Sequence, residues 1–257
     1  MIEVDIDSRD EGFFVIDSET TNTMDTSVIL DMSAVFVNMA KIHELHLQYQ
    51  KDKPLKPLPF EHFVQLPYIS KFTMFPDINE QISLGATVDN EVLRFWKKQK
   101  EETNNSGYKE YIAKLFTTLG KDDVRTCIDK FEYFLSTCFN EVPHSTQSFK
   151  QVFILERSGG FDSNKYYNMV YNLGLGVDFS RMKYYSRREI RTLISSNRWR
   201  IPRGVLQPNT TNWNGGVKDM ISNAMGGEFI PHVAINDCLI DAYMIYLLKI
   251  EIDNFYL

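Results

Sequence analysis

The sequence predicts an α/β protein built around a mixed β-sheet. Residues 13–16 and 28–38 are apolar runs rich in β-branched and aromatic side chains, which is typical of buried strands, and we expect them to pair as a hairpin. A further short strand is expected at residues 152–155. Because the strands come early and the helical segments lie between and after them without strict alternation, the sheet is expected to be mixed.

Apolar residues at helical spacing mark the helices. Residues 122–139 are the plainest case, because two aspartates suit the first turn and an apolar stripe follows them. Further helices are expected at residues 88–102, 164–173, 188–196 and 235–251. Irregular chain rich in Pro, Asn, Thr or Gly is expected at residues 51–67, 103–107 and 209–227, with a short helical piece at 217–224.

Length and composition are those of a globular protein. The chain has 257 residues, of which 43% are hydrophobic, and we expect residues 1–257 to form a single domain. No uncharged apolar run reaches about 18 residues, so no transmembrane helix is expected. The N-terminus lacks the basic start of a secretory signal, and three cysteines without metal-ligand spacing fit a reducing cytoplasm.

Positive charge is concentrated in one segment of an acidic chain. The formal net charge of −6 disfavours unspecific attraction of nucleic acid to the whole surface. Residues 181–203 nevertheless carry eight basic residues and one acid, with Tyr184, Tyr185 and Trp199 among them. Arginine and aromatic side chains together can hold a phosphate backbone and stack bases. The segment is therefore a candidate nucleic-acid interface, and a solvated surface without a partner is the alternative.

An acidic pair follows the first expected strand. Asp17 and Glu19 are two residues apart, and in a strand such residues point to the same face. Two close carboxylates repel each other unless a cation lies between them, and Mg²⁺ is a cation that carboxylates bind. The alternative is an ordinary strand end, because Asp-x-Glu pairs are common where a strand gives way to a turn.

Further acids lie in the second half of the chain. Asp162 follows the strand expected at 152–155 and begins a helix, where a helix N-cap is the alternative interpretation. His232 and Asp237 are five residues apart at the start of the last helix, where a capping histidine and a solvent-facing aspartate are the alternative. Asp241, one turn further on, competes with Asp237 as a ligand, although it could also be a supporting or solvent-facing residue.

These residues, in this order and on these elements, resemble the DnaQ-like 3′–5′ exonuclease superfamily, in its subclass with four acids and a histidine (DEDDh). Several segments are similar, more narrowly, to the exonuclease A branch of T-even bacteriophages. These segments are residues 13–36, 87–99, 161–162, 182–192 and 232–238. The resemblance implies a ribonuclease H-like fold, in which helices flank a central mixed sheet, with insertions at about residues 39–80 and 103–150.

The resemblance also assigns catalytic roles. Asp17, Glu19, Asp162 and Asp237 would hold two Mg²⁺ or Mn²⁺ ions, and His232 would deprotonate or orient the attacking water. General chemistry agrees, because two such ions stabilise an in-line displacement at phosphorus and a histidine titrates near neutral pH.

Substrate contacts follow from the same resemblance. Thr20 and Thr21 would lie beside the terminal nucleotide, and Tyr184, Arg188 and Arg191 would line the path of a single strand. The implied function is a 3′–5′ exonuclease that hydrolyses phosphodiester bonds at DNA 3′ ends and releases mononucleotides, in the cytoplasm of an infected bacterium if a phage encodes it. An exoribonuclease of the same fold, an inactive nucleic-acid-binding module and a structural phage protein are the alternatives.

Overall fold

The computed structural model describes residues 12–49, 57–142, 152–175, 187–201, 206–210, 212, 230 and 232–256. The strands are β1 (Gly12–Thr20), β2 (Ile29–Val37), β3 (Ile69–Met74), β4 (Val152–Glu156) and β5 (Arg187–Glu189). The helices are α1 (Met39–Tyr49), α2 (Phe60–Phe63), α3 (Ile78–Ser83), α4 (Asn90–Glu102), α5 (Ser106–Phe116), α6 (Val124–Glu141), α7 (Phe161–Asn172), α8 (Ile190–Ser196), the 3₁₀ turn η2 (Arg198–Arg200) and α10 (Ala234–Tyr256).

The five strands form one mixed sheet in the order β3-β2-β1-β4-β5. β1 pairs antiparallel with β2, as the expected hairpin requires, and β2 pairs antiparallel with β3. The β1–β4 and β4–β5 pairs are parallel. β1 is thus the central strand, and a strand covered on both faces has a continuous apolar run rather than alternation. The predicted α/β fold with a mixed sheet flanked by helices is confirmed.

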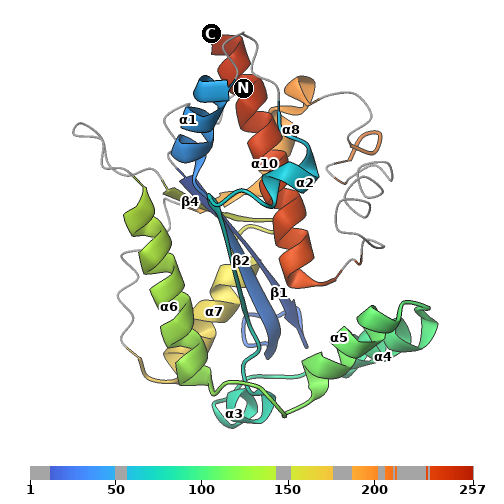
Figure 1. The fold of residues 1–257 in the computed structure, drawn as a ribbon. Helices are drawn as coiled ribbons and strands as arrows, with labels where there is room; N and C mark the ends of the chain where they lie inside the picture. Colours follow the sequence, from blue (N-terminus) through green and yellow to red (C-terminus); the bar gives the residue numbers. More distant parts are fainter. Residues whose placement is uncertain are drawn as a thin grey trace.

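The two faces of β1 belong to different cores. Phe13 and Val15 pack with residues of α8 and α10, whereas Phe14 and Ile16 pack with residues of α6 and α7. Figure 1 shows this arrangement, with α6 and α7 on one side of the sheet and α8 and α10 on the other. Successive side chains of a strand point to opposite faces, so the odd-numbered residues of β1 point towards α10. This alternation decides where Asp17 points.

A smaller core attaches helices α4 and α5 to one end of the sheet. Val28 and Leu30 pack against Trp96 of α4 and Tyr108 of α5. The indole N–H of Trp96 also donates to the carbonyl oxygen of Thr20, at 3.3 Å, at the end of β1. Figure 1 shows the α4–α5 pair beside the end of α10 at which that helix begins.

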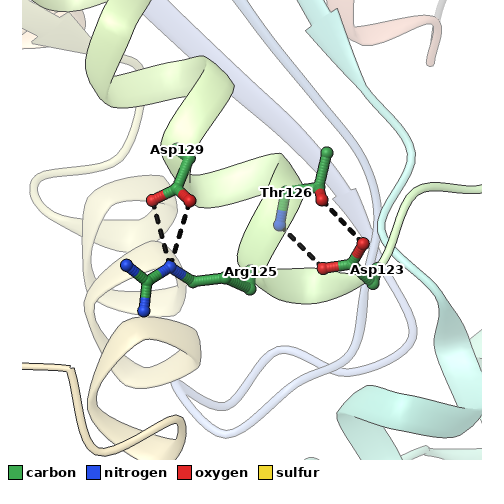
Figure 2. Close-up of polar contacts among 4 residues, drawn as sticks. All are labelled: Asp123, Arg125, Thr126 and Asp129. Carbon is green, nitrogen blue, oxygen red and sulfur yellow. Dashed lines mark hydrogen bonds and ion pairs between the residues drawn. The ribbon is translucent and has the colours of Figure 1, made fainter.

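Helix α6 begins at Val124, two residues after its expected start, because Asp123 is the N-cap residue rather than part of the first turn. The carboxylate of Asp123 accepts the backbone N–H of Thr126 at 2.8 Å and its hydroxyl at 2.6 Å, which satisfies the first turn (Figure 2). Arg125, in the first turn, pairs with Asp129 one turn later at 3.1 Å. The helix continues to Glu141, slightly beyond its expected end.

Two stretches expected to be irregular contain helix. Within 51–67 lies α2, because Phe60 and Phe63 are buried against the ring of Tyr243 on α10, at centroid distances of 5.2 and 5.3 Å. The loop expected at 103–107 is shorter, because the side chain of Asn105 accepts the N–H of Tyr108 at 3.0 Å and so starts α5. A packing contact therefore interrupts the first irregular stretch, and a capping contact shortens the second.

The other predicted helices also differ from their expected bounds: α4 begins at Asn90 rather than at 88, and α10 runs from Ala234 to Tyr256 rather than over 235–251. The helix expected at 188–196 begins at Ile190, because Arg188 and Glu189 pair with β4 as part of strand β5. The helix expected at 164–173 begins at Phe161.

Nearly all of the loop predicted at 209–227 lies outside the described residues. The cysteines are buried and free. No helix in the described part of the chain is long and apolar enough to span a membrane.

Candidate metal centre and active site

Three carboxylates converge where β1 meets the start of α10. Asp17 and Glu19 leave β1 on the face that α10 covers, and Asp237 lies in the first turn of α10. One oxygen of each of the three lies within 4.8 Å of the oxygens of the other two. The strand alternation and the packing of α10 on β1 and β2 bring together residues more than 200 positions apart. We refer to Asp17, Glu19 and Asp237 as the acid cluster.

The acid cluster concentrates like charge in a partly buried place, because Glu19 is buried and Asp17 and Asp237 are half-buried. Burial is the largest cause that raises the pKa of Asp17 well above its usual range, and the nearby carboxylates of Asp162, Glu19, Asp237 and Asp241 raise it further. Burial is also the largest cause that raises the pKa of Glu19, and the nearby carboxylates of Asp237 and Asp31 raise it further. All three donors are hard carboxylate oxygens, the type that Mg²⁺ and Mn²⁺ bind. The cluster therefore fits a divalent cation, which would neutralise its repulsion.

Asp162 approaches the acid cluster from α7. It is 3% exposed, and one of its oxygens accepts the hydroxyl of Ser18, the residue between Asp17 and Glu19, at 2.6 Å. Burial raises its pKa to about 7. Asp162 does not belong to the three residues within 4.8 Å. It is not a helix N-cap either, because Gly160 takes that position with a φ of 91°, in the left-handed region that glycine favours.

His232 contacts the acid cluster through its backbone. Its backbone N–H donates to Asp237 Oδ2 at 3.1 Å, so the same carboxylate that joins the cluster also holds the turn before α10. The His232 ring is exposed and meets the rings of Phe95 and Trp96 edge-on, at centroid distances of 5.4 and 6.4 Å. Its φ of 59° is uncommon for a residue other than glycine, and such backbone strain gathers at functional sites.

Asp241 has a different environment from Asp237. It is 4% exposed and is bound in a bidentate manner by Arg157, at 2.7 Å to Nη2 and at 2.8 Å to Nε. The expectation that Asp241 could be a solvent-facing residue is therefore wrong, because one turn of α10 carries it into the core rather than out of it. Arg157 follows β4, so the ion pair also fixes α10 to the sheet.

The residues expected to bind substrate differ in exposure, and they come from different elements. Thr20 and Thr21 are buried, and their hydroxyls donate to the carbonyl oxygens of Asn22 and Thr87, at 2.9 and 3.1 Å. Arg188 on β5 lies over the ring of Phe153, with its guanidinium carbon 4.6 Å from the ring centroid. Arg191 is exposed on α8. Tyr184 lies outside the described residues.

The sequence did not indicate three further polar residues near the acid cluster, which are Asp31, Tyr111 and Tyr108. Asp31 of β2 is paired directly with Glu19 and is 1% exposed. Its carboxylate accepts the hydroxyl of Tyr111 from α5 at 2.6 Å, and burial raises its pKa to about 6. Tyr108, one turn earlier on α5, is 4% exposed and its hydroxyl has no partner among the described residues. The only local signal was an aspartate inside an otherwise apolar strand.

Comparison with known proteins gives a likeness of fold. No family model and no curated protein match the sequence. Among solved structures, cell-death related nuclease 4 (CRN-4) superposes with a TM-score of 0.50 at 11% identity. The alignment covers 95% of this chain and 64% of the CRN-4 chain, so this chain spans less than two thirds of that protein.

Two weaker likenesses accompany it. The nuclease domain of 3′hExo, a DEDDh family member bound to rAMP, has a TM-score of 0.46 at 13% identity, over 95% of this chain and 94% of that one. E. coli Exonuclease I in complex with an oligonucleotide has a TM-score of 0.49 at 14% identity, over 93% of this chain and 40% of that one. At such low identity the CRN-4 likeness concerns the path of the chain, and it agrees with the ribonuclease H-like fold.

Proposed function

We propose that this protein is a divalent-metal-dependent 3′–5′ exonuclease that removes mononucleotides from the 3′ end of single-stranded DNA. The observation that carries the proposal is the acid cluster, in which two ends of the chain bring three carboxylates within 4.8 Å beside an exposed histidine. Buried carboxylates that raise one another's pKa are unfavourable unless they serve a ligand. The resemblance of the motif blocks to the exonuclease A branch supports the choice of reaction and of DNA.

Each residue of the site has a proposed task. Asp17, Glu19 and Asp237 hold the cation directly, and Asp162, kept in place by Ser18, completes the set for a second cation. When bound, two Mg²⁺ or Mn²⁺ ions supply Lewis-acid chemistry that favours attack of water on phosphorus and departure of the sugar oxygen. The exposed His232 takes the proton of the attacking water.

The orientation of His232 is held by two elements. Asp237 binds its backbone, and Phe95 and Trp96 of α4 support its ring. A general base must be positioned as well as have a suitable pKa, so these contacts are part of the proposed machinery. The basic residues Arg188 and Arg191 are proposed to contact the phosphate backbone of the strand.

A degradation assay tests the proposal. The protein is mixed with single-stranded DNA and with RNA of matched sequence, labelled at the 5′ end, with Mg²⁺ or with chelator. We expect a ladder of products that shortens from the 3′ end of DNA, only in Mg²⁺, and its loss in His232→Ala by a factor of about 10²–10⁴. Preferential shortening of RNA would reassign the substrate to RNA, and recovery of both polymers at full length in Mg²⁺ would contradict catalysis.

A further inference from the structure

A groove of about 430 Å³ opens between helices α4 and α5. This volume is within the range of about 300–1,000 Å³ found for small-molecule sites. Its walls come from both helices and are mainly apolar. The lining residues are Leu93, Trp96, Lys97, Lys100, Ile112, Ala113, Phe116 and Thr117.

The groove and the acid cluster share a wall. Trp96 lines the groove, and the same indole lies 6.4 Å from the ring of His232 and donates to the carbonyl oxygen of Thr20, next to Glu19. Figure 1 shows α4 and α5 beside the start of α10, where His232 and Asp237 are found. The groove and the acid cluster are therefore neighbours, with Trp96 between them.

The chemistry of the groove suits a strand of nucleic acid. Phe116 is 38% exposed, so its ring offers a surface on which a base can stack, and it lies 6.5 Å from the Trp96 ring. Both ionisable residues that line the groove, Lys97 and Lys100, are cations. Lys97 has Glu101 at 4.0 Å, but an exposed pair of this kind is weak and does not prevent contact with a phosphate.

We propose that the α4–α5 groove is a second binding site for the single-stranded substrate, which holds a nucleotide upstream of the one that is cleaved. A base stacks on Phe116, and Lys97 and Lys100 contact the phosphates on either side. This inference rests on the proposed function for its substrate class. It makes efficiency depend on strand length, because a substrate of one nucleotide occupies the acid cluster without reaching the groove.

Three variants test the groove. Phe116→Ala removes the stacking surface, and Lys100→Glu reverses a groove charge. Lys98→Glu is the matched control, since it makes the same charge change on the same helix at a residue that does not line the groove. Each is assayed on a long oligodeoxythymidylate and on the p-nitrophenyl ester of thymidine 5′-monophosphate, which has a single nucleotide.

We expect Phe116→Ala to raise KM for the long strand about tenfold, the usual scale of one lost base stack. Lys100→Glu should raise it too and lower the salt dependence of log KM by about 0.7, the value for one phosphate contact on a single strand. Hydrolysis of the ester should stay unchanged, and Lys98→Glu should behave as the unaltered protein. Equal losses on strand and ester, or an unchanged KM for the strand, would overturn the proposal.

A binding measurement separates this proposal from the proposed function. Fluorescence anisotropy of a labelled oligodeoxythymidylate in chelator reports strand binding without hydrolysis. If the protein cleaves neither substrate but the two groove variants weaken binding and Lys98→Glu does not, the groove is upheld and the nuclease assignment fails. If all variants bind the strand equally, the groove holds something else, such as a protein segment, and the proposal is overturned.

Discussion

The N-terminus of α7 and the first turn of α10 both lie against carboxylates near β1, one of them buried and the other half-buried, but they balance that charge in opposite ways. At α7, Glu156 is 1% exposed and accepts the amides of Asp162 and Ser163 at 3.0 Å each and the Ser163 hydroxyl at 2.7 Å. At α10, Asp237 faces Asp17 and Glu19 instead. A buried charge that the protein's own donors satisfy is structural, whereas one that faces like charge is suited to an external cation.

The same contrast recurs within α10, one turn apart. Asp237 belongs to the acid cluster, and Asp241 is closed off by the Arg157 guanidinium. The ion pair is well placed, because Arg157 is hydrogen-bonded through two nitrogens and the Asp241 side chain is 5% exposed. Charge partners, and not position in the helix, therefore distinguish the two aspartates.

The largest effect is expected from a pair of matched variants of α10. Asp237→Asn should lower exonuclease activity about a thousandfold or more, since bound cations contribute several kcal/mol of transition-state stabilisation. Asp241→Asn should keep activity within about tenfold and instead reduce stability by about 2 kcal/mol, because Arg157 loses a charged acceptor. Activity assays and chemical denaturation of both variants measure this. Equal activity losses in the two would remove the distinction between them.

The next effect is expected at α7. Glu156→Gln should destabilise the protein by about 3 kcal/mol, because an amide cannot accept from three donors as a carboxylate does. For a chain of this size the midpoint of thermal unfolding should fall by about 10 °C, and added Mg²⁺ should not restore it. Glu110→Gln, at an exposed position of α5, is the control and should change nothing. Full rescue by Mg²⁺ would place Glu156 with the acid cluster instead.

The parts of the site that local periodicity determines could be predicted from the sequence. The spacing of Asp17 and Glu19 places them on one strand face, and the apolar run before them marks β1. The start of α10 could be read in the same way. Each of these inferences needs only a few consecutive residues, because strand and helix periods act over that range.

The parts of the site that depend on contacts between distant residues could not be predicted from the sequence. The hydrogen bond from Tyr111 to Asp31 joins residues 80 apart, and the pair of Arg157 and Asp241 joins residues 84 apart. The sequence predicts helix at Arg188 and Glu189, whereas these residues form part of strand β5 because they pair with β4. The groove likewise arises only when α4 and α5 pack together, so no single segment indicates it.

The smallest effect is expected in the stability of the metal-free protein, and it follows from the sign of the pKa shifts. A carboxyl whose pKa is raised in the folded state binds protons more tightly there than in the unfolded chain, so stability falls as pH rises from the usual pKa through the raised one. For Asp162 that window runs from 3.8 to about 7. The raised pKa values of Asp17 and Glu19 act in the same direction.

Asp17→Asn with Glu19→Gln should therefore stabilise the metal-free protein by about 1–2 kcal/mol at about pH 8, and by much less at about pH 2, where these acids are protonated in both states. Thermal unfolding followed by circular dichroism measures this. Mg²⁺ at a hundred times its dissociation constant should stabilise the unaltered protein by about 2.7 kcal/mol and the double variant hardly at all. Destabilisation of the double variant at alkaline pH would mean that the acid cluster, like Glu156, is balanced from within the protein.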